Sequence, residues 1–336
     1  MFRKIANKIK KSYFVVNKIY LFILFIFLLG INATIAFSGI VVVFLLLLFT
    51  RKVPLEPKEY YRYDTHVYKH ANDHELKLDI WYPNQYSDFY PVVFFAHGGG
   101  WISGFRNQPN NVSWSKYLAS KGFAVVSIDY RYGINNSMEE ILSDYSDALI
   151  YVKKYGKELS LNTDNMALMG LSAGGHLSLL YASYYTFCGS KEKMSGIKGI
   201  VAFYSPSDLK DIFEKDNKSL FARFATMATL KGLPNEKGDV YDYYSPINWI
   251  SKRMLPTFIA HGKMDNVVPF ISSVKLAQKL KKYDILYKFF VHKRGGHTFE
   301  FILKDFQTVR ILENTSNFLK GLLKNESRFQ IHKREN

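Results

Sequence analysis

The chain has 336 residues, 48% of them hydrophobic, which is enough to bury the core of one large domain or two modest ones. Lys and Arg number 45 against 29 Asp and Glu, a formal net charge of +16, but no nucleic-acid recognition motif accompanies this charge, so we expect no nucleic-acid partner. The single cysteine, Cys188, excludes an intrachain disulfide and a cysteine-based metal site.

The N-terminal segment is basic and strongly apolar. Its first 52 residues hold eight Lys or Arg and no acidic residue, and the 32 residues from Ile19 to Thr50 carry no charge. This run exceeds the ~18 residues that indicate a transmembrane helix and the ~15 of a secretory signal. We therefore expect residues 1–55 to be a membrane anchor, with the basic side chains against lipid headgroups.

The number of spans and their direction stay open at this point. As one helix, the uncharged run would be ~48 Å long, and a break near Gly30 would divide it into two short spans. A single span and a hairpin both satisfy the positive-inside rule. The side of the membrane that the rest of the chain faces is therefore not determined.

Residues 56–336 have the composition of a soluble globular domain. Short apolar runs alternate there with longer segments of helical period, which predicts an α/β fold with a mostly parallel, doubly wound sheet. The first two strands are close enough in sequence to form an antiparallel hairpin at one edge. Strands are expected at Tyr63–Tyr68, Leu76–Tyr82, Val92–Ala96, Ala124–Asp129, Met166–Met169, Gly199–Tyr204, Thr257–Ala260 and Tyr287–Val291, and helices at Met138–Tyr155, Ala173–Tyr184, Ile271–Lys282 and Asp305–Leu323.

A glycine-rich loop, His97-Gly98-Gly99-Gly100-Trp101, directly follows the strand expected at Val92–Ala96. Backbone amides that stabilise a developing oxyanion must approach the substrate closely, and glycine permits this approach. We expect the amides of Gly98 and Gly99 to form part of an oxyanion hole. His97 belongs to the loop that shapes the hole, and we expect a structural role for it.

The second motif is Gly170-Leu171-Ser172-Ala173-Gly174-Gly175, between an expected strand and an expected helix. This is the context of a nucleophile elbow, in which a serine occupies a tight, strained turn whose flanking positions tolerate almost no side chain. Ser172 is therefore the expected nucleophile, and the amide of Ala173 is the third expected oxyanion donor.

A long insertion at residues 205–256 follows, with several aromatic and apolar side chains. In a sheet of this type, an insertion after a strand can lie over the C-terminal strand ends, where ligands bind. We expect it to form a helical cap. A peripheral pair of helices is the alternative.

The acid and the base should follow the serine in that order. Asp265 lies after the strand expected at Thr257–Ala260, and His297 lies after the strand expected at Tyr287–Val291. Both would reach the same edge as Ser172, with His297 taking the serine proton and Asp265 holding the imidazole tautomer. The competing candidates are His176, His261 and His292 for the base and Asp208 for the acid.

These stretches, HGGGW at His97–Trp101, GLSAGG at Gly170–Gly175, HGKMDNVVP at His261–Pro269 and GGHTF at Gly295–Phe299, resemble the α/β-hydrolase superfamily. Within it, the chain from Tyr63 to Leu323 looks like the HGGG-type, hormone-sensitive-lipase-like carboxylesterases. It is also similar to isoprenylcysteine methylesterases, kynurenine formamidases, and feruloyl and acetylxylan esterases.

The expected activity is hydrolysis of small or lipid-like carboxylic esters through an acyl-enzyme, with no metal and no organic cofactor. The same three residues would serve an amide hydrolase of the formamidase or peptidase kind. A binding protein on an inactive hydrolase fold is the alternative from another class.

Overall fold

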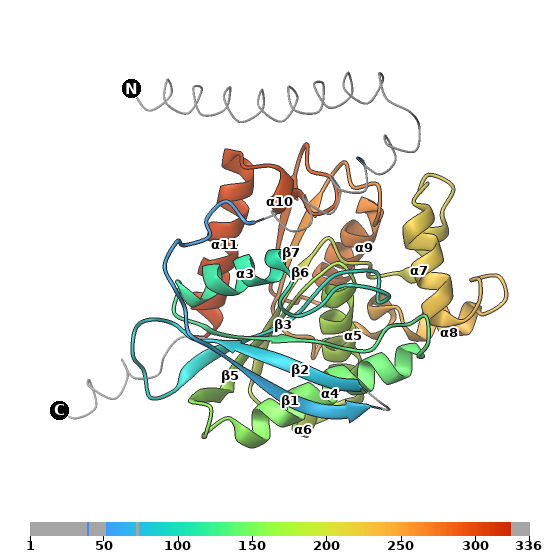
Figure 1. Cartoon of the computed structure of the whole chain (residues 1–336). Helices are drawn as coiled ribbons and strands as arrows, with labels where there is room; N and C mark the ends of the chain where they lie inside the picture. Colours follow the sequence, from blue (N-terminus) through green and yellow to red (C-terminus); the bar gives the residue numbers. More distant parts are fainter. Residues whose placement is uncertain (1–38, 40–51, 72–73, 324–336) are drawn as a thin grey trace, which may run out of the picture.

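The computed structural model of the protein describes residues 39, 52–71 and 74–323. These residues form one eight-stranded sheet flanked by helices, with strand order β1-β2-β4-β3-β5-β6-β7-β8 (Figure 1). The strands are β1 (Tyr63–Ala71), β2 (His74–Trp81), β3 (Tyr90–Ala96), β4 (Ala124–Ile128), β5 (Leu161–Leu171), β6 (Ile197–Phe203), β7 (Thr257–Gly262) and β8 (Tyr287–His292). The α-helices are α3 (Pro109–Ala119), α4 (Met138–Tyr155), α5 (Ala173–Cys188), α6 (Lys191–Met194), α7 (Leu220–Leu230), α8 (Gly238–Tyr243), α9 (Phe270–Lys282), α10 (Phe299–Ile302) and α11 (Phe306–Leu322), and the 3-10 helices are η1 (Leu209–Phe213) and η2 (Pro246–Trp249).

The sheet is parallel from β4 to β8 and antiparallel at its β1 edge. β1 and β2 form an antiparallel hairpin in which Tyr63 lies opposite Trp81, and β2 pairs antiparallel with β4. The expected edge hairpin and the mostly parallel, doubly wound sheet are both confirmed. Every pair from β4 onward is parallel, so these strands present their C-terminal ends at one edge of the sheet.

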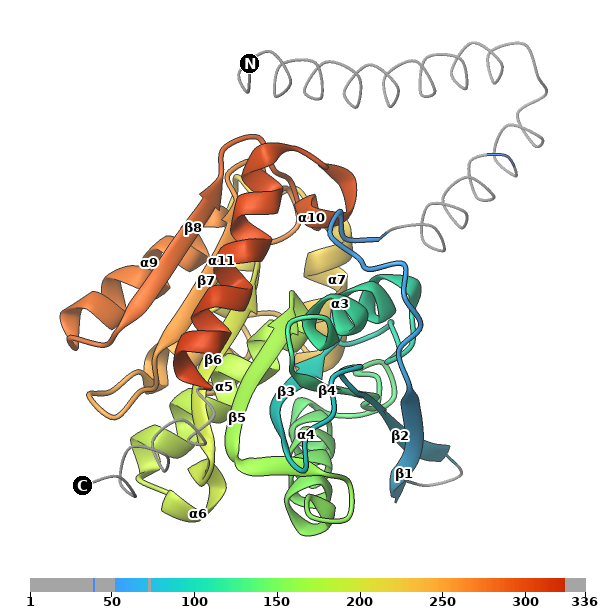
Figure 2. The same ribbon diagram turned by 90° about the vertical axis from the view of Figure 1, so that its left-hand side faces the viewer.

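Successive side chains of the central strands pack into different cores. On β3, Val92, Phe94 and Ala96 contact the core that includes α4, α5 and α9, whereas Val93 and Phe95 contact the core that includes α3 and α11. Figure 2 shows α3 and α11 on one side of the sheet and α4 and α5 on the other. Because both faces are covered, these central strands are apolar without polar alternation.

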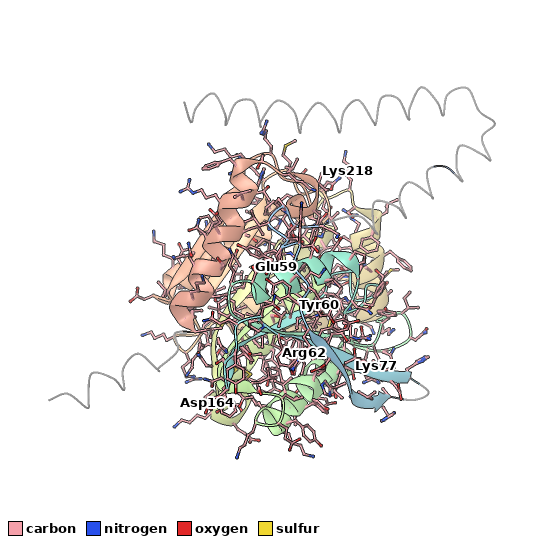
Figure 3. The ribbon with its side chains drawn as sticks, turned by 60° about the vertical axis from the view of Figure 1, so that its left-hand side comes forward. Glu59, Tyr60, Arg62, Lys77, Asp164 and Lys218 are labelled. Atoms are coloured by element: carbon pink, nitrogen blue, oxygen red, sulfur yellow. The ribbon has the colours of Figure 1, made fainter. Side chains whose placement is uncertain are left out.

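The insertion at residues 205–256 is helical. It contains η1, α7, α8 and η2, and α7 packs directly on the glycine-rich loop after β3. A Cβ added to Gly100 would lie 2.9 Å from Ala225 Cβ and 3.1 Å from the Phe221 ring, so α7 touches the backbone of this loop. Lys218, just before α7, lies at the opposite end of the body from Asp164 near the start of β5 (Figure 3). The first turn of α7 therefore lies at the C-terminal edge of the sheet.

The clearest differences from the sequence expectation are in β5 and α3. β5 is longer than Met166–Met169 because Leu161 and Asn162 pair with Tyr90 and Pro91 of β3, ahead of a register shift that precedes the apolar run. Helix α3 was not expected, since it mixes polar residues such as Asn111 and Ser113 with its aromatic side chains. These two side chains are buried, and they donate hydrogen bonds to the backbone carbonyls of Phe105 and Asn110.

The membrane anchor predicted for residues 1–55 falls almost entirely outside the described residues and stays a prediction. Within residues 39, 52–71 and 74–323, no helix combines the length and the apolar character that crossing a bilayer requires. Val53 is buried, and its backbone N–H donates to Ser113 Oγ at 3.1 Å. The chain is therefore hydrogen-bonded to α3 close to residue 52, where the described residues resume after Gly39.

Candidate active site

Ser172 lies at a sharp turn between β5 and α5. Its backbone has φ 50° and ψ −116°, a positive-φ conformation that a residue with a side chain rarely adopts. The turn closes because Gly170 and Gly174 have no Cβ: a methyl group on Gly170 would collide with the backbone of Gly174, and one on Gly174 would collide with Ala96. The strained turn therefore projects Ser172 from the strand end, as the motif predicted.

Hydrogen bonds join Ser172, His297 and Asp265 in one chain. His297 Nε2 is 3.1 Å from Ser172 Oγ, and His297 Nδ1 is 2.7 Å from Asp265 Oδ2. The three side chains come from the loops after β5, β7 and β8 and meet at the same edge of the sheet. This geometry suits a nucleophile, a base and a carboxylate that fixes the imidazole tautomer.

The carboxylate of Asp265 is held in its ionised form. Burial by itself would raise its pKa, but the neighbouring His297 and the hydrogen bonds from His261 and His297 bring the pKa below its usual value. The backbone N–H groups of Val267 and Val268 also donate to Oδ1, at 2.8 and 3.0 Å. An ionised Asp265 accepts the Nδ1–H of His297, which leaves Nε2 as the acceptor facing Ser172.

Two of the three expected oxyanion donors, Gly98 and Ala173, adjoin the serine. A Cβ on Gly98 would be 3.5 Å from Ser172 Cβ, so the loop after β3 lies against the nucleophile. Among the hydrogen bonds of the described residues, the backbone N–H groups of Gly98 and Gly99 have no acceptor. Ala173 is the first residue of α5, where backbone N–H groups have no partner within the helix. These amides suit a negatively charged oxygen.

Contacts of His97 with Tyr130 hold the start of the glycine-rich loop in place. The His97 ring is buried and stacks on Tyr130 at a centroid distance of 4.2 Å, and the Tyr130 hydroxyl donates to the His97 carbonyl at 2.8 Å. Burial lowers the pKa of His97. The expected structural role of His97 agrees with this placement.

The competing residues are engaged elsewhere. His176 Nε2 bonds the Tyr244 carbonyl at 2.8 Å, and burial lowers its pKa to about 4. His292 pairs with Asp305 at 3.0 Å, and Asp208 pairs with Lys275 at 3.1 Å.

His261 is closer to the site, because its Nε2 is 3.1 Å from Asp265 Oδ2 and its Nδ1 is 2.7 Å from Ser273 Oγ. It contacts the acid from behind and does not reach Ser172. Sequence reasoning considered His261 only as a rival base, although its i,i+4 spacing to Asp265 was a usable signal.

A small cavity of about 20 Å³ adjoins Ser172. Its walls come from the glycine-rich loop, the cap and the loop after β7; the lining residues are Gly100, Trp101, Ser172, Ala173, Pro206, Ile212, Phe221, Ala222, Ala225, Thr226, Val267 and Val268. A larger groove of about 360 Å³ is lined by residues such as Tyr86 and Lys121 and includes none of the three linked side chains. Of these two spaces, the smaller cavity is therefore the one that adjoins the linked side chains.

A family model matches residues 78–280, more than half of the chain, and its description is BD-FAE. The chain belongs to the BD-FAE family. The matched residues run from β2 to α9 and include Ser172, Asp265 and the cap, whereas His297 lies beyond them.

Individual relatives of this BD-FAE protein are named as esterases. It is 29% identical over 183 residues to a probable carboxylic ester hydrolase, LipM, of Mycobacterium tuberculosis, covering 53% of this chain and 42% of the relative. It is 27% identical over 248 residues to a probable isoprenylcysteine alpha-carbonyl methylesterase of Oryza sativa subsp. japonica, covering 67% of this chain and 56% of the relative. This chain therefore spans about half the length of these curated relatives.

A solved carbohydrate esterase from gut microbiota superposes with a TM-score of 0.65 at 21% identity, covering 80% of this chain and 99% of the esterase. This likeness establishes a shared fold, and it agrees with the α/β-hydrolase resemblance that the motifs indicated.

Sequence reasoning missed one further group of this BD-FAE protein, Glu300 on α10. Its side chain is fully buried, and its Oε1 accepts the Tyr204 hydroxyl at 2.5 Å and the Trp114 indole N–H at 3.4 Å. Burial raises the pKa of Glu300 to about 7, against hydrogen bonds that lower it. A glutamate in a helical segment normally indicates a solvated face, so no local signal could have revealed it.

No group of three or more His, Cys, Asp or Glu side chains suited to a metal occurs in the described part of the chain.

Proposed function

We propose that this protein is a serine hydrolase that cleaves carboxylic esters through an acyl-enzyme. The observation that carries the proposal is the continuous hydrogen-bonded chain from Asp265 through His297 to Ser172, with Ser172 on a strained turn beside unpaired backbone amides. The esterase names of the relatives and of the solved neighbours support the same reaction class.

In the acylation step, Ser172 Oγ attacks the ester carbonyl carbon while His297 Nε2 takes the serine proton. The amides of Gly98, Gly99 and Ala173 stabilise the negative charge on the carbonyl oxygen. As the carbon–oxygen bond to the alcohol breaks, His297 passes its proton to the leaving alcohol.

Deacylation repeats these transfers with water. His297 takes a proton from the water, the resulting hydroxide attacks the acyl group on Ser172, and the acid departs as the proton returns to the serine. Asp265 stabilises the imidazolium in both steps, and its low pKa keeps it ionised throughout.

The dimensions of the site favour a short acyl group and an apolar alcohol. The cavity of about 20 Å³ beside Ser172 has room for little more than one water molecule, which needs roughly 10–15 Å³ on this measure. Outside it, the first turns of α7 expose Leu220, Phe221 and Phe224, with exposed fractions of 82%, 49% and 51%. This apolar rim suits a hydrophobic part of the substrate that remains outside the cavity.

Residues 19–50 anchor the protein in a membrane in this proposal. The support is the uncharged run of 32 residues, which ends two residues before Lys52, and the basic residues that precede it. Extraction of membranes with alkaline carbonate tests the anchor: the full chain should remain in the pellet, and its release into the supernatant would contradict it.

Hydrolysis of p-nitrophenyl acetate, butyrate, octanoate and palmitate by the full chain in detergent tests the reaction. Ser172→Ala should abolish turnover and labelling by a fluorophosphonate probe. Asp208→Asn is a matched control, because this carboxylate contacts Lys275 and not His297, and it should retain activity. Equal turnover by wild type and Ser172→Ala would refute the assignment of the nucleophile, and faster cleavage of the matching anilides than of the esters would favour an amide hydrolase.

A further inference from the structure

Glu300 is a buried carboxyl to which no cationic side chain of residues 52–71 or 74–323 is bonded. It lies on α10, three residues after His297, with an exposed fraction of 0%. Oε1 accepts hydrogen bonds from Tyr204, which directly follows β6, and from Trp114 on α3, and Oε2 has no hydrogen-bond partner among the described residues. A buried carboxyl that is incompletely bonded is costly, which suggests that it has a function beyond packing.

Tyr204 connects this carboxyl to the imidazole of His297. The two rings meet edge to face, with centroids 4.6 Å apart, while the Tyr204 hydroxyl points to Glu300. The backbone of Tyr204 has φ 38°, and its N–H donates to the Ala260 carbonyl at 2.6 Å. Tyr204 is therefore held at its backbone by β7 and at its hydroxyl by Glu300, with its ring against His297.

The surroundings of Glu300 are dry and aromatic. The ring of Phe299 packs against Phe203 and Tyr204, and Trp114 packs against Phe203. The titratable groups that face the carboxyl are Tyr204 from β6 and His297 from the loop after β8. In such a medium, a negative charge acts on a neighbouring imidazolium more strongly than it would in water.

We propose that Glu300, acting through Tyr204, is a positioning residue for His297. The Glu300–Tyr204 bond holds the imidazole ring in line with Ser172 and Asp265, and the carboxylate charge favours the imidazolium that forms when the serine proton is transferred. This inference rests on the proposed ester hydrolysis.

The charge of Glu300 can be separated from its hydrogen bonds by substitution. A glutamine at position 300 would still accept hydrogen bonds from Tyr204 and Trp114 through its amide oxygen, so the observed contacts do not require a charge. Burial raises the pKa of Glu300 to about 7, while the adjacent His297 lowers it, so ionised Glu300 and protonated His297 favour each other.

Glu300→Gln and Tyr204→Phe test the inference in the full chain. Glu300→Gln keeps the shape and the acceptor, and Tyr204→Phe keeps the ring but removes the hydroxyl. For p-nitrophenyl acetate we expect both variants to lower kcat about tenfold with KM nearly unchanged. In Glu300→Gln, the midpoint of the acidic limb of kcat/KM should also move to lower pH by about 0.5 to 1 unit, because a nearby negative charge is lost.

A second measurement does not depend on turnover. The titration midpoint of the His297 imidazole, followed by NMR and assigned with His297→Asn, should move to lower pH in Glu300→Gln. Wild-type kcat together with unmoved kinetic and NMR midpoints would overturn the inference. A loss of activity with raised KM and unmoved midpoints would also overturn it, since it would indicate a structural role. Failure of the wild type to cleave esters, with the NMR shift present, would instead count against the proposed function.

Discussion

Truncating Phe221 to alanine should lengthen the acyl chain that the site accepts. In the wild type, the cavity beside Ser172 measures about 20 Å³, and the Phe221 ring forms part of its wall. The two methylenes that distinguish butyrate from acetate have no room there, so we expect the acetate ester to be the better substrate. Removal of the ring opens the wall toward the first turn of α7.

The size of the effect follows from apolar burial. Each methylene that becomes buried contributes about 0.8 kcal/mol, so two contribute about 1.6 kcal/mol. At 1.4 kcal/mol per factor of ten, the ratio of kcat/KM for butyrate over acetate should rise about 15-fold in Phe221→Ala.

The assay compares kcat/KM for the p-nitrophenyl esters in wild type, Phe221→Ala and Phe224→Ala. Phe224 is a matched control because it lies on the same helix with a similar exposed fraction, 51% against 49%, and does not line the cavity. An equal change of the ratio in both variants would refute the reasoning. So would a wild type that cleaves octanoate faster than acetate.

Three further predictions concern the acid, the buried carboxyl and the elbow. Asp265→Asn should lower kcat about 10³- to 10⁴-fold in the ester assay because the imidazole loses its tautomer control, whereas Asp208→Asn should stay within about twofold of wild type. The pKa of Glu300 rises from 4.5 to about 7 on folding, so the free energy of unfolding falls as pH rises through that range. Denaturant titrations should therefore find Glu300→Gln more stable than wild type by about 3 kcal/mol at pH 8, with little difference at pH 4. Gly170→Ala should abolish activity and lower Tm sharply, because its methyl group would collide with the Gly174 backbone. The control Gly321→Ala, in a helix with open space around the residue, should instead stabilise the protein by about 0.5 to 1 kcal/mol. Unchanged activity in Gly170→Ala would contradict the elbow geometry.

Local sequence determined the fold class and the places of the three linked residues. Apolar runs of strand length are compatible with few architectures when they alternate with helical segments, and parallel strands bring the loops that follow them to one edge. The contacts that exclude a side chain at Gly170, with the Gly174 backbone, and at Gly99, with the Ser103 carbonyl, are constraints between near neighbours in the chain. Such constraints are visible without coordinates because only glycine fits the backbone there.

Where some strands and helices begin and end depended on contacts with distant parts of the chain. The stretch Leu161–Asn165 carries no strand pattern, yet it extends β5 because Leu161 and Asn162 pair with Tyr90 and Pro91 of β3. Helix α3 was missed for a similar reason, since its polar residues Asn111 and Ser113 are buried by contacts with segments outside the helix, including hydrogen bonds to the Phe105 carbonyl and from the Val53 N–H. Local propensity is a weak signal where pairing with a distant segment supplies the stability.

Only the tertiary structure decided what surrounds the reacting groups. Glu300 meets Tyr204 and Trp114, 96 and 186 residues away in sequence, and the wall of the cavity comes from the loop after β3, from α7 and from the loop after β7. The burial of a residue, the volume of a cavity and the pKa of a buried carboxyl all depend on neighbouring residues that come from distant segments of the chain. A motif fixes which atoms can react, but the packing of the whole chain sets the space, the dielectric and the neighbouring charges in which they do so.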